Sequence, residues 1–115
     1  MASQTPFRVE WAPPARADVE AIIDYIVQDR PASAASILDR ILRAAASLRT
    51  MPLRGRTVPE LAEVGVCDYR ELILRPWRVV YRVEGGTVYI VAVVDSRRDL
   101  ADLLLERVVR LSLRG

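Results

Sequence analysis

The stretch that decides the fold runs from Tyr69 to Asp95 and reads YRELILRPWRVVYRVEGGTVYIVAVVD. β-Branched and aromatic residues dominate it, and these residues suit the pleated, half-buried surface of a strand better than a helix. Between Trp77 and Glu84, four apolar side chains alternate with a second set that is mostly polar, a period of two that predicts a strand. Pro76 breaks the ladder, so we expect a further strand at 69–74 ahead of it.

The glycine pair Gly85-Gly86 lies at the centre of this stretch. It supplies the positive φ values that a two-residue hairpin needs, so strands 78–84 and 87–94 should be antiparallel neighbours. The second of these strands is apolar on both faces, which is expected of a strand that is covered on both sides. Three strands in a meander are therefore predicted to form the centre of the fold.

Working outward toward the N-terminus, two amphipathic segments precede the meander. Residues 7–11 alternate and predict a short first strand, and Pro13-Pro14 then sets up a helix over Ala15–Asp29. Pro31 opens a second helix, and the short gap between the two allows only an antiparallel helical hairpin. The apolar stripe of the second helix comprises Ile37, Leu38, Ile41, Ala45 and Leu48.

Residues 51–68 lack clear periodicity and are interpreted as a loop, with one helical turn near 59–64. The arginines at positions 49, 54 and 56 form an acid-free cluster at its start, for which a solvated loop and a binding patch both remain open. After the last strand, Ser96–Asp99 resembles a capping box. A C-terminal helix follows, with an apolar stripe made by Leu100, Leu103, Leu104, Val108 and Leu111.

These segments predict a single domain over residues 1–115 with the order β-α-α-β-β-β-α. The fold class is α+β: a small antiparallel sheet packed against a helical hairpin, with a C-terminal helix. No apolar run approaches the roughly 20 residues that span a bilayer, and a signal-peptide pattern is absent. We therefore expect a soluble cytoplasmic protein without a membrane partner.

The composition bounds the chemistry. The 115 residues include no histidine and no lysine, so all seventeen basic residues are arginines, which suit phosphate and carboxylate. The commonest general base and metal ligand is therefore missing, and the single cysteine, Cys67, excludes a cysteine-cluster metal site. We expect no cofactor and no metal. The net charge of +2 permits an acidic partner without establishing one.

Three segments together resemble the RelE/ParE superfamily of bacterial type II toxins over nearly the whole chain. They are ARADVEAIIDYI in the first helix, DYREL followed by WRVVYRVEGGTVYIVAVV in the meander, and SRRDLADLLLERV after it. The resemblance implies a small basic toxin that is encoded beside an antitoxin that masks it. It further implies one of two targets, DNA gyrase in the ParE branch or messenger RNA on the ribosome in the RelE branch.

The resemblance also places candidate residues. Those for target binding are Arg70, Arg78, Arg97 and Arg98. A second basic position on the strand is Leu72 here, the tyrosine that ribonuclease members use falls near Leu104, and their histidine falls near Asp95. The usual proton-transfer groups are thus replaced, although Glu71 or Asp95 could serve as an unusual base. Alternatively, the arginines form a solvated sheet face or pair with acids at positions 71, 84 and 99.

The C-terminal pattern, an acidic residue at position 99 followed by leucines, is closer to ParE than to RelE. We therefore expect a ParE-like toxin that inhibits DNA gyrase without hydrolysis. The alternatives are a RelE-like ribosome-dependent endoribonuclease and a degenerate, non-toxic member that only binds the antitoxin. In each case we expect a hetero-oligomer with a cognate antitoxin, whose amphipathic helix would fill an apolar groove. Candidate residues for this groove are Ile37, Leu38, Leu100, Leu103, Leu104 and Val108.

Overall fold

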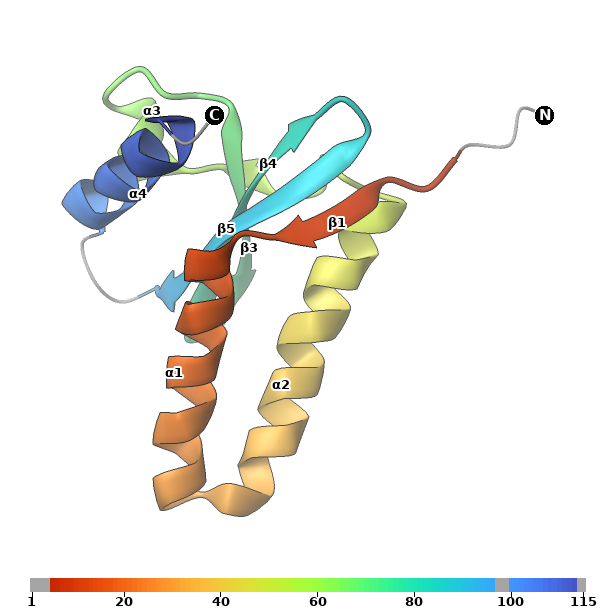
Figure 1. The fold of residues 1–115 in the computed structure, drawn as a ribbon, viewed down its shortest axis with the longest axis vertical. Coiled ribbons are helices and arrows are strands. Elements are labelled where there is room, and N and C mark those ends of the chain that lie inside the picture. Colours follow the sequence, from red (N-terminus) through yellow and green to blue (C-terminus); the bar gives the residue numbers. More distant parts are fainter. Residues whose placement is uncertain (1–4, 97–99, 114–115) are drawn as a thin grey trace.

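The computed structural model describes residues 5–96 and 100–113, which form one sheet with helices on both faces (Figure 1). The predicted α+β class and the helical hairpin are confirmed. In chain order the elements are β1 (Arg8–Trp11), α1 (Pro13–Asp29), α2 (Pro31–Ala46), a 3₁₀ turn (Ser47–Arg49), β2 (Arg56–Thr57), α3 (Pro59–Ala62), β3 (Tyr69–Leu74), β4 (Trp77–Glu84), β5 (Thr87–Asp95) and α4 (Ala101–Leu113).

The sheet has the strand order β1-β5-β4-β3-β2. The predicted meander is present, because β3 pairs with β4 and β4 with β5, both antiparallel. Gly85 and Gly86 have φ values of 56° and 86°, as the two-residue turn requires. Two features differ from the expectation. β1 runs parallel to β5, and the segment interpreted as a loop contributes a fifth strand, β2, which pairs with Arg70 and Glu71 of β3.

Alternation along the strands produces two cores, one on each face of the sheet. Val79 and Tyr81 of β4 point into the first core, where they meet Ala15 and Val19 of α1 and Ile41 of α2. The second core lies between the other face and the helices α3 and α4. It contains Val58, Leu61, Tyr69, Val80, Ala92, Leu100, Leu104 and Val108. The two-sided apolar character of β5 thus follows from its position between two helical layers.

A β-bulge interrupts β5 at Val91. Val80 pairs with Ala92, whereas the next residue of β4, Tyr81, pairs with Ile90, so Val91 is the extra residue. Consequently Val91 and Ala92 both face the second core, and alternation resumes after them.

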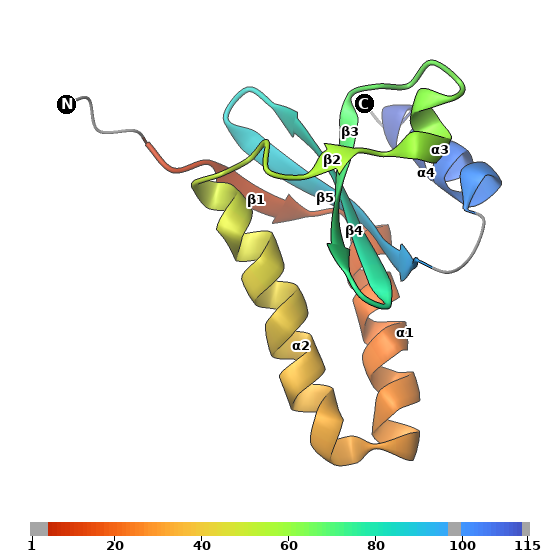
Figure 2. The same cartoon turned by 180° about the vertical axis from the view of Figure 1, so that it is seen from behind.

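The helical hairpin extends well beyond the sheet. Figures 1 and 2 show α1 and α2 side by side, with the turn between them projecting away from the strands. α1 begins at Pro13, two residues before the expected start, because proline suits the first turn of a helix. The expected capping box lies partly outside the described residues, since positions 97–99 are not among them. No helix within residues 5–96 and 100–113 has the length and apolar character needed to cross a membrane.

Candidate functional site

Of the two predicted target-binding residues that the structure describes, Arg78 is the more deeply buried, with 4% of its surface exposed. Its Nη1 lies 2.8 Å from Oε1 of Glu60 and 3.0 Å from Oε1 of Glu71, and its Nη2 lies 2.5 Å from Oε2 of Glu60. The second oxygen of Glu71 accepts a 2.7 Å hydrogen bond from Nε of Arg56. The four side chains therefore form a chain of alternating charges on the α3 side of the sheet.

This arrangement shifts the pKa of two of its members, Glu60 and Arg78. The hydrogen bond from Arg78 lowers the pKa of Glu60, against the opposing effect of burial. The same hydrogen bond raises the pKa of Arg78 above its ordinary value. The expected alternative for Arg78, an ion pair with Glu71, is thus confirmed, and Glu60 is an additional partner. A contact between Arg78 and a target stays a prediction, and in the free chain its guanidinium faces carboxylates.

Glu71 was a candidate base and has only 1% of its surface exposed. Both of its oxygens are occupied by arginines, so this carboxylate cannot approach a substrate without breaking the network. Glu60 could not be identified from the sequence, because it lies 18 residues from Arg78 in a segment without periodicity.

Arg70 lies on the opposite face of the sheet from Arg78. Arg70 is the cross-strand partner of Tyr81, and Tyr81 is three positions after Arg78 on β4, so the two arginines alternate to different sides. The Nη1 of Arg70 donates to the carbonyl oxygens of Gly55 (2.7 Å) and Leu53 (3.3 Å). The structure therefore does not bring Arg70 and Arg78 together on one surface. Arg97 and Arg98 lie outside the described residues.

The loop arginines Arg54 and Arg56 likewise have different partners. Arg56 belongs to the network with Glu71, whereas Arg54 donates a 2.7 Å hydrogen bond to the hydroxyl of Ser47. The backbone N–H of Gly55 donates to the Tyr81 hydroxyl at 2.9 Å. Burial raises the pKa of Tyr81, so this phenol is a neutral structural group.

A second polar group, which the sequence analysis missed, lies near the C-terminal end of α4. Tyr69, Arg82 and Tyr89 are direct cross-strand neighbours on β3, β4 and β5. They line a hollow of about 420 Å³ together with Asp68 and Glu84. The Arg82 guanidinium carbon lies 4.9 Å from the centre of the Tyr89 ring, and burial raises the pKa of Tyr69. Arg82 and Tyr89 are equally far in sequence from the Gly85-Gly86 turn, so the sequence could have indicated that they are cross-strand neighbours.

The residues proposed for antitoxin binding differ in accessibility. Leu100, Leu104 and Val108 are buried in the second core, so the expected exposed groove is not present at these three positions. The physical reason is that α3 and β5 already cover this face of α4. Leu103 is 43% exposed, and Ile37 and Leu38 are half-buried against the first core. Their contact with an antitoxin stays a prediction.

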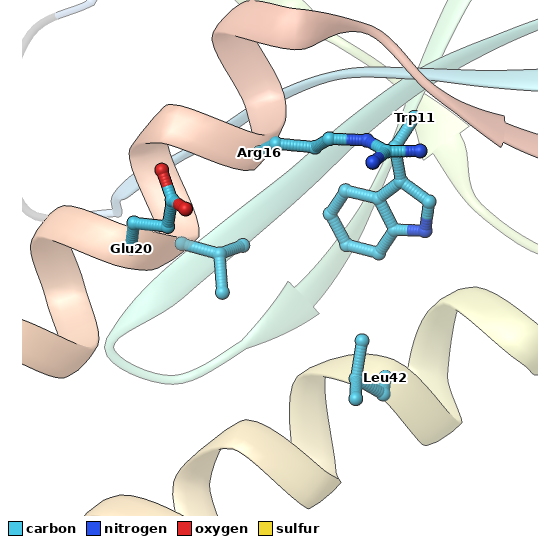
Figure 3. A pocket seen from close by; sticks show the side chains of 5 residues that line it. Trp11, Arg16, Glu20 and Leu42 are labelled. Carbon is cyan, nitrogen blue, oxygen red and sulfur yellow. The ribbon is translucent and has the colours of Figure 1, made fainter.

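Two hollows flank α1. One, of about 280 Å³, is lined by Trp11, Arg16, Val19, Glu20 and Leu42, and Figure 3 shows Arg16 pointing toward the Trp11 ring above Leu42. The other, of about 580 Å³, lies between α1, the start of β4, the end of β5 and the start of α4. Its lining includes Ile22, Tyr25, Trp77 and Leu103. Across the described parts of the chain, no three histidine, cysteine, aspartate or glutamate residues are grouped to hold a metal ion.

The amino-acid sequence matches a known protein family and a named relative. Residues 9–100 match the family described as the ParE toxin of the type II toxin-antitoxin system parDE. A toxin of Caulobacter vibrioides named RelE2 is 37% identical over 92 residues, which cover 79% of this chain and 97% of that protein.

Two solved structures share the fold. One, described as a chromosomal ParDE system from P. aeruginosa, has a TM-score of 0.66 and 24% identity over 80% of this chain and 98% of that chain. The other, the toxin-antitoxin complex RelBE2 from Mycobacterium tuberculosis, has a TM-score of 0.54 and 20% identity over 83% of this chain and 97% of that chain.

Proposed function

Since the chain belongs to the ParE toxin family of type II toxin-antitoxin systems, we propose that it inhibits DNA gyrase and is neutralised by a cognate antitoxin. The family match spans residues 9–100, and the 37% identical relative is also named as a toxin. Gyrase is a bacterial cytoplasmic enzyme, so the proposed place of action is the cytoplasm.

One observation carries the proposal of a non-hydrolytic toxin. Cleavage of RNA through its 2′-hydroxyl needs a positioned base beside the groups that stabilise the charged phosphorane. Beside Arg78 the nearest carboxylates, Glu60 and Glu71, are each held by two charge-assisted contacts that keep them in ion pairs. The hydrogen bond from Arg78 lowers the pKa of Glu60, which makes this carboxylate a weak base. Glu71 is buried and both of its oxygens are occupied by arginines, so it cannot reach a substrate.

The partner is proposed on separate grounds. The solved structures with this fold are described as a ParDE system and a RelBE2 toxin-antitoxin complex. On this chain the two hollows beside α1 offer apolar floors, and Leu42 and Leu103 are exposed at their margins. An amphipathic helix of an antitoxin would bury such side chains.

An endoribonuclease is the second candidate, and the hollow at Tyr69, Arg82 and Tyr89 favours it. A neutral phenol beside a guanidinium can donate a proton to a leaving oxygen while the arginine holds a phosphate. Its weakness is electrostatic: Arg82 is already paired with Glu84, and Asp68 lines the same hollow. The third candidate, a degenerate member that only binds its antitoxin, predicts neither activity.

Two assays on the purified chain separate these functions. We expect inhibition of gyrase supercoiling, with accumulation of cleaved DNA, and no cleavage of messenger RNA on ribosomes. If the parent chain instead cleaves ribosome-bound RNA, Tyr69→Phe abolishes this cleavage and gyrase supercoiling is unaffected, the chain is a ribonuclease and not a gyrase inhibitor. If neither activity is present but the antitoxin still binds, the third candidate is correct.

A further inference from the structure

The loop from Ser47 to Thr57, together with Arg70, forms a surface that we call the basic loop. Arg49 and Arg54 are exposed on it, and Arg70 reaches it from β3. The guanidinium groups of Arg54 and Arg70 donate to a hydroxyl and to backbone carbonyls, which are neutral acceptors. Within residues 5–96 and 100–113, no carboxylate lies at ion-pair distance from these three arginines. The basic loop therefore carries uncompensated positive charge.

Several other arginines, among them Arg56 at the end of the same loop, are paired with carboxylates. Arg8 pairs with Glu10, Arg56 and Arg78 with Glu71, and Arg107 with Asp18. The small net charge of +2 thus conceals a local excess of positive charge on the basic loop. An excess of fixed charge of one sign attracts a ligand of the other sign.

The loop is also held in one conformation. Besides the contacts of Arg70, the N–H of Gly55 donates to the Tyr81 hydroxyl, and the N–H groups of Met51 and Arg54 donate to Ser47 and Met51 carbonyls at 3.2 Å. A Cβ atom at Gly55 would lie 2.7 Å from the backbone oxygen of Glu71, so the close approach requires glycine. A rigid loop loses little conformational entropy when it binds, which favours a binding role.

The exposed apolar residues of the loop limit the kind of ligand. Met51 and Leu53 are 54% and 61% exposed and aliphatic, so they offer no ring on which an unpaired base could stack. Two such side chains are also too few for the apolar centre of a stable protein interface of about 800 Å² per partner. Phosphate contacts need neither stacking nor an apolar centre, because arginine forks match phosphate oxygens directly.

We propose that the basic loop binds the phosphodiester backbone of duplex DNA through Arg49, Arg54 and Arg70. This inference rests on the proposed function, since a toxin acting on gyrase would meet its target on DNA. It adds a contact with the nucleic acid itself, made on the side of the sheet opposite Arg78.

Fluorescence anisotropy of the full chain with a labelled 20-base-pair duplex tests the proposal at several salt concentrations. Three phosphate contacts predict that log K falls with log salt at a slope of about −2.7, from about 0.9 per contact. Arg49→Gln and Arg54→Gln should each reduce this slope by about 0.9. The matched control is Arg43→Gln, which removes the same charge from an exposed position on α2.

Several outcomes would overturn the proposal: no binding at low salt, an unchanged slope in both variants, or an equal change in Arg43→Gln. Preferential binding of single-stranded RNA would also contradict it. Loss of antitoxin or gyrase affinity in the variants, without DNA binding by the parent chain, would assign the loop to a protein partner instead. If the parent chain inhibits gyrase but does not bind DNA, the proposed DNA contact is wrong and the proposed function stands. If the parent chain binds DNA but does not inhibit gyrase, the proposed function is wrong and the DNA contact stands.

Discussion

Arg107 of α4 and Asp18 of α1 form an ion pair across the edge of the sheet, with Nη1 and Oδ2 2.9 Å apart, although the two residues are 89 positions apart in the sequence. The same oxygen accepts the N–H of Val93, and the same nitrogen donates to the carbonyl of Val91. β1 pairs with β5 only as far as Ile90, so both backbone groups lie where β1 has turned away. Asp18 and Arg107 therefore satisfy backbone groups of β5 that a longer β1 would otherwise pair with. Their ion pair also connects α1 on one face of the sheet to α4 on the other.

This pair should contribute measurably to stability. Arg107→Gln leaves the mostly buried Asp18 carboxylate without its charged partner, and we expect a loss of about 1–3 kcal/mol in the free energy of unfolding. Urea denaturation measures it. The control is Arg110→Gln on the same helix, whose exposed pair with Glu106 should contribute no more than about 0.5 kcal/mol. Equal effects of the two substitutions would show that the bridge across the sheet edge adds nothing.

A larger effect is expected at Glu71. Glu71→Gln removes the buried negative charge between Arg56 and Arg78 and leaves Arg78 with Glu60 alone. Breaking a buried pair from one side costs about 3–5 kcal/mol, because the remaining charge stays desolvated. Thermal denaturation should show a correspondingly large decrease in Tm. Glu20→Gln, on the exposed side of α1, serves as the control, and a similar small change in both would contradict the structural role of the network.

The ion pair of Glu60 predicts a dependence of stability on pH. Arg78 lowers the pKa of Glu60 in the folded chain below its ordinary value of 4.5, so the unfolded chain binds its proton first on acidification. The stabilisation is therefore complete above pH 4.5 and is lost as the pH falls through the folded pKa. Denaturation at several pH values should show a shallower acid dependence in Glu60→Gln than in Glu63→Gln, an exposed neighbour. Identical pH profiles would refute the linkage.

The alternation along β4 explains why so much of the fold could be predicted. A period of two assigns each side chain to a face, and glycines 85 and 86 set the register as far as the pair of Tyr81 and Ile90, so the meander and its two apolar faces follow from the sequence. The bulge at Val91, beyond that pair, does not. β2 could not be predicted, because a strand of two residues has no period. It is held instead by the ion pair of Arg56 with Glu71 and by the N–H of Val58, which donates to the Tyr69 carbonyl.

The functional residues were less predictable because their environment depends on tertiary contacts. Asp18 lies on the polar side of the α1 stripe, and only the end of β1 gives it a buried partner. Arg78 has the pattern of a surface strand residue, yet α3 places Glu60 over it. The periodicity of a strand or helix predicts which face each side chain lies on. Which charged side chains meet on that face depends on other segments, such as α3, whose sequence has no clear periodicity.

The last prediction concerns antitoxin binding and uses two adjacent leucines of α4. Leu104 is buried in the second core, whereas Leu103 is 43% exposed and lines the hollow beside Tyr25. Leu104→Asp would bury a charge and should unfold the free chain, so it cannot report on the complex. Leu103→Asp should leave Tm nearly unchanged, because surface substitutions shift stability by about 0.5 kcal/mol or less.

If the antitoxin covers this hollow, Leu103→Asp should weaken its binding by at least about tenfold, which corresponds to 1.4 kcal/mol. Titration calorimetry with the product of the neighbouring gene measures the affinity, and a negative ΔCp would indicate apolar burial. Val109→Asp is the matched control, since Val109 is similarly exposed on the same helix but does not line the hollow. Unchanged affinity in Leu103→Asp, or an equal loss in both variants, would exclude this hollow as the antitoxin site. In that case Leu42→Asp, at the hollow between α1 and α2, tests the other surface in the same way.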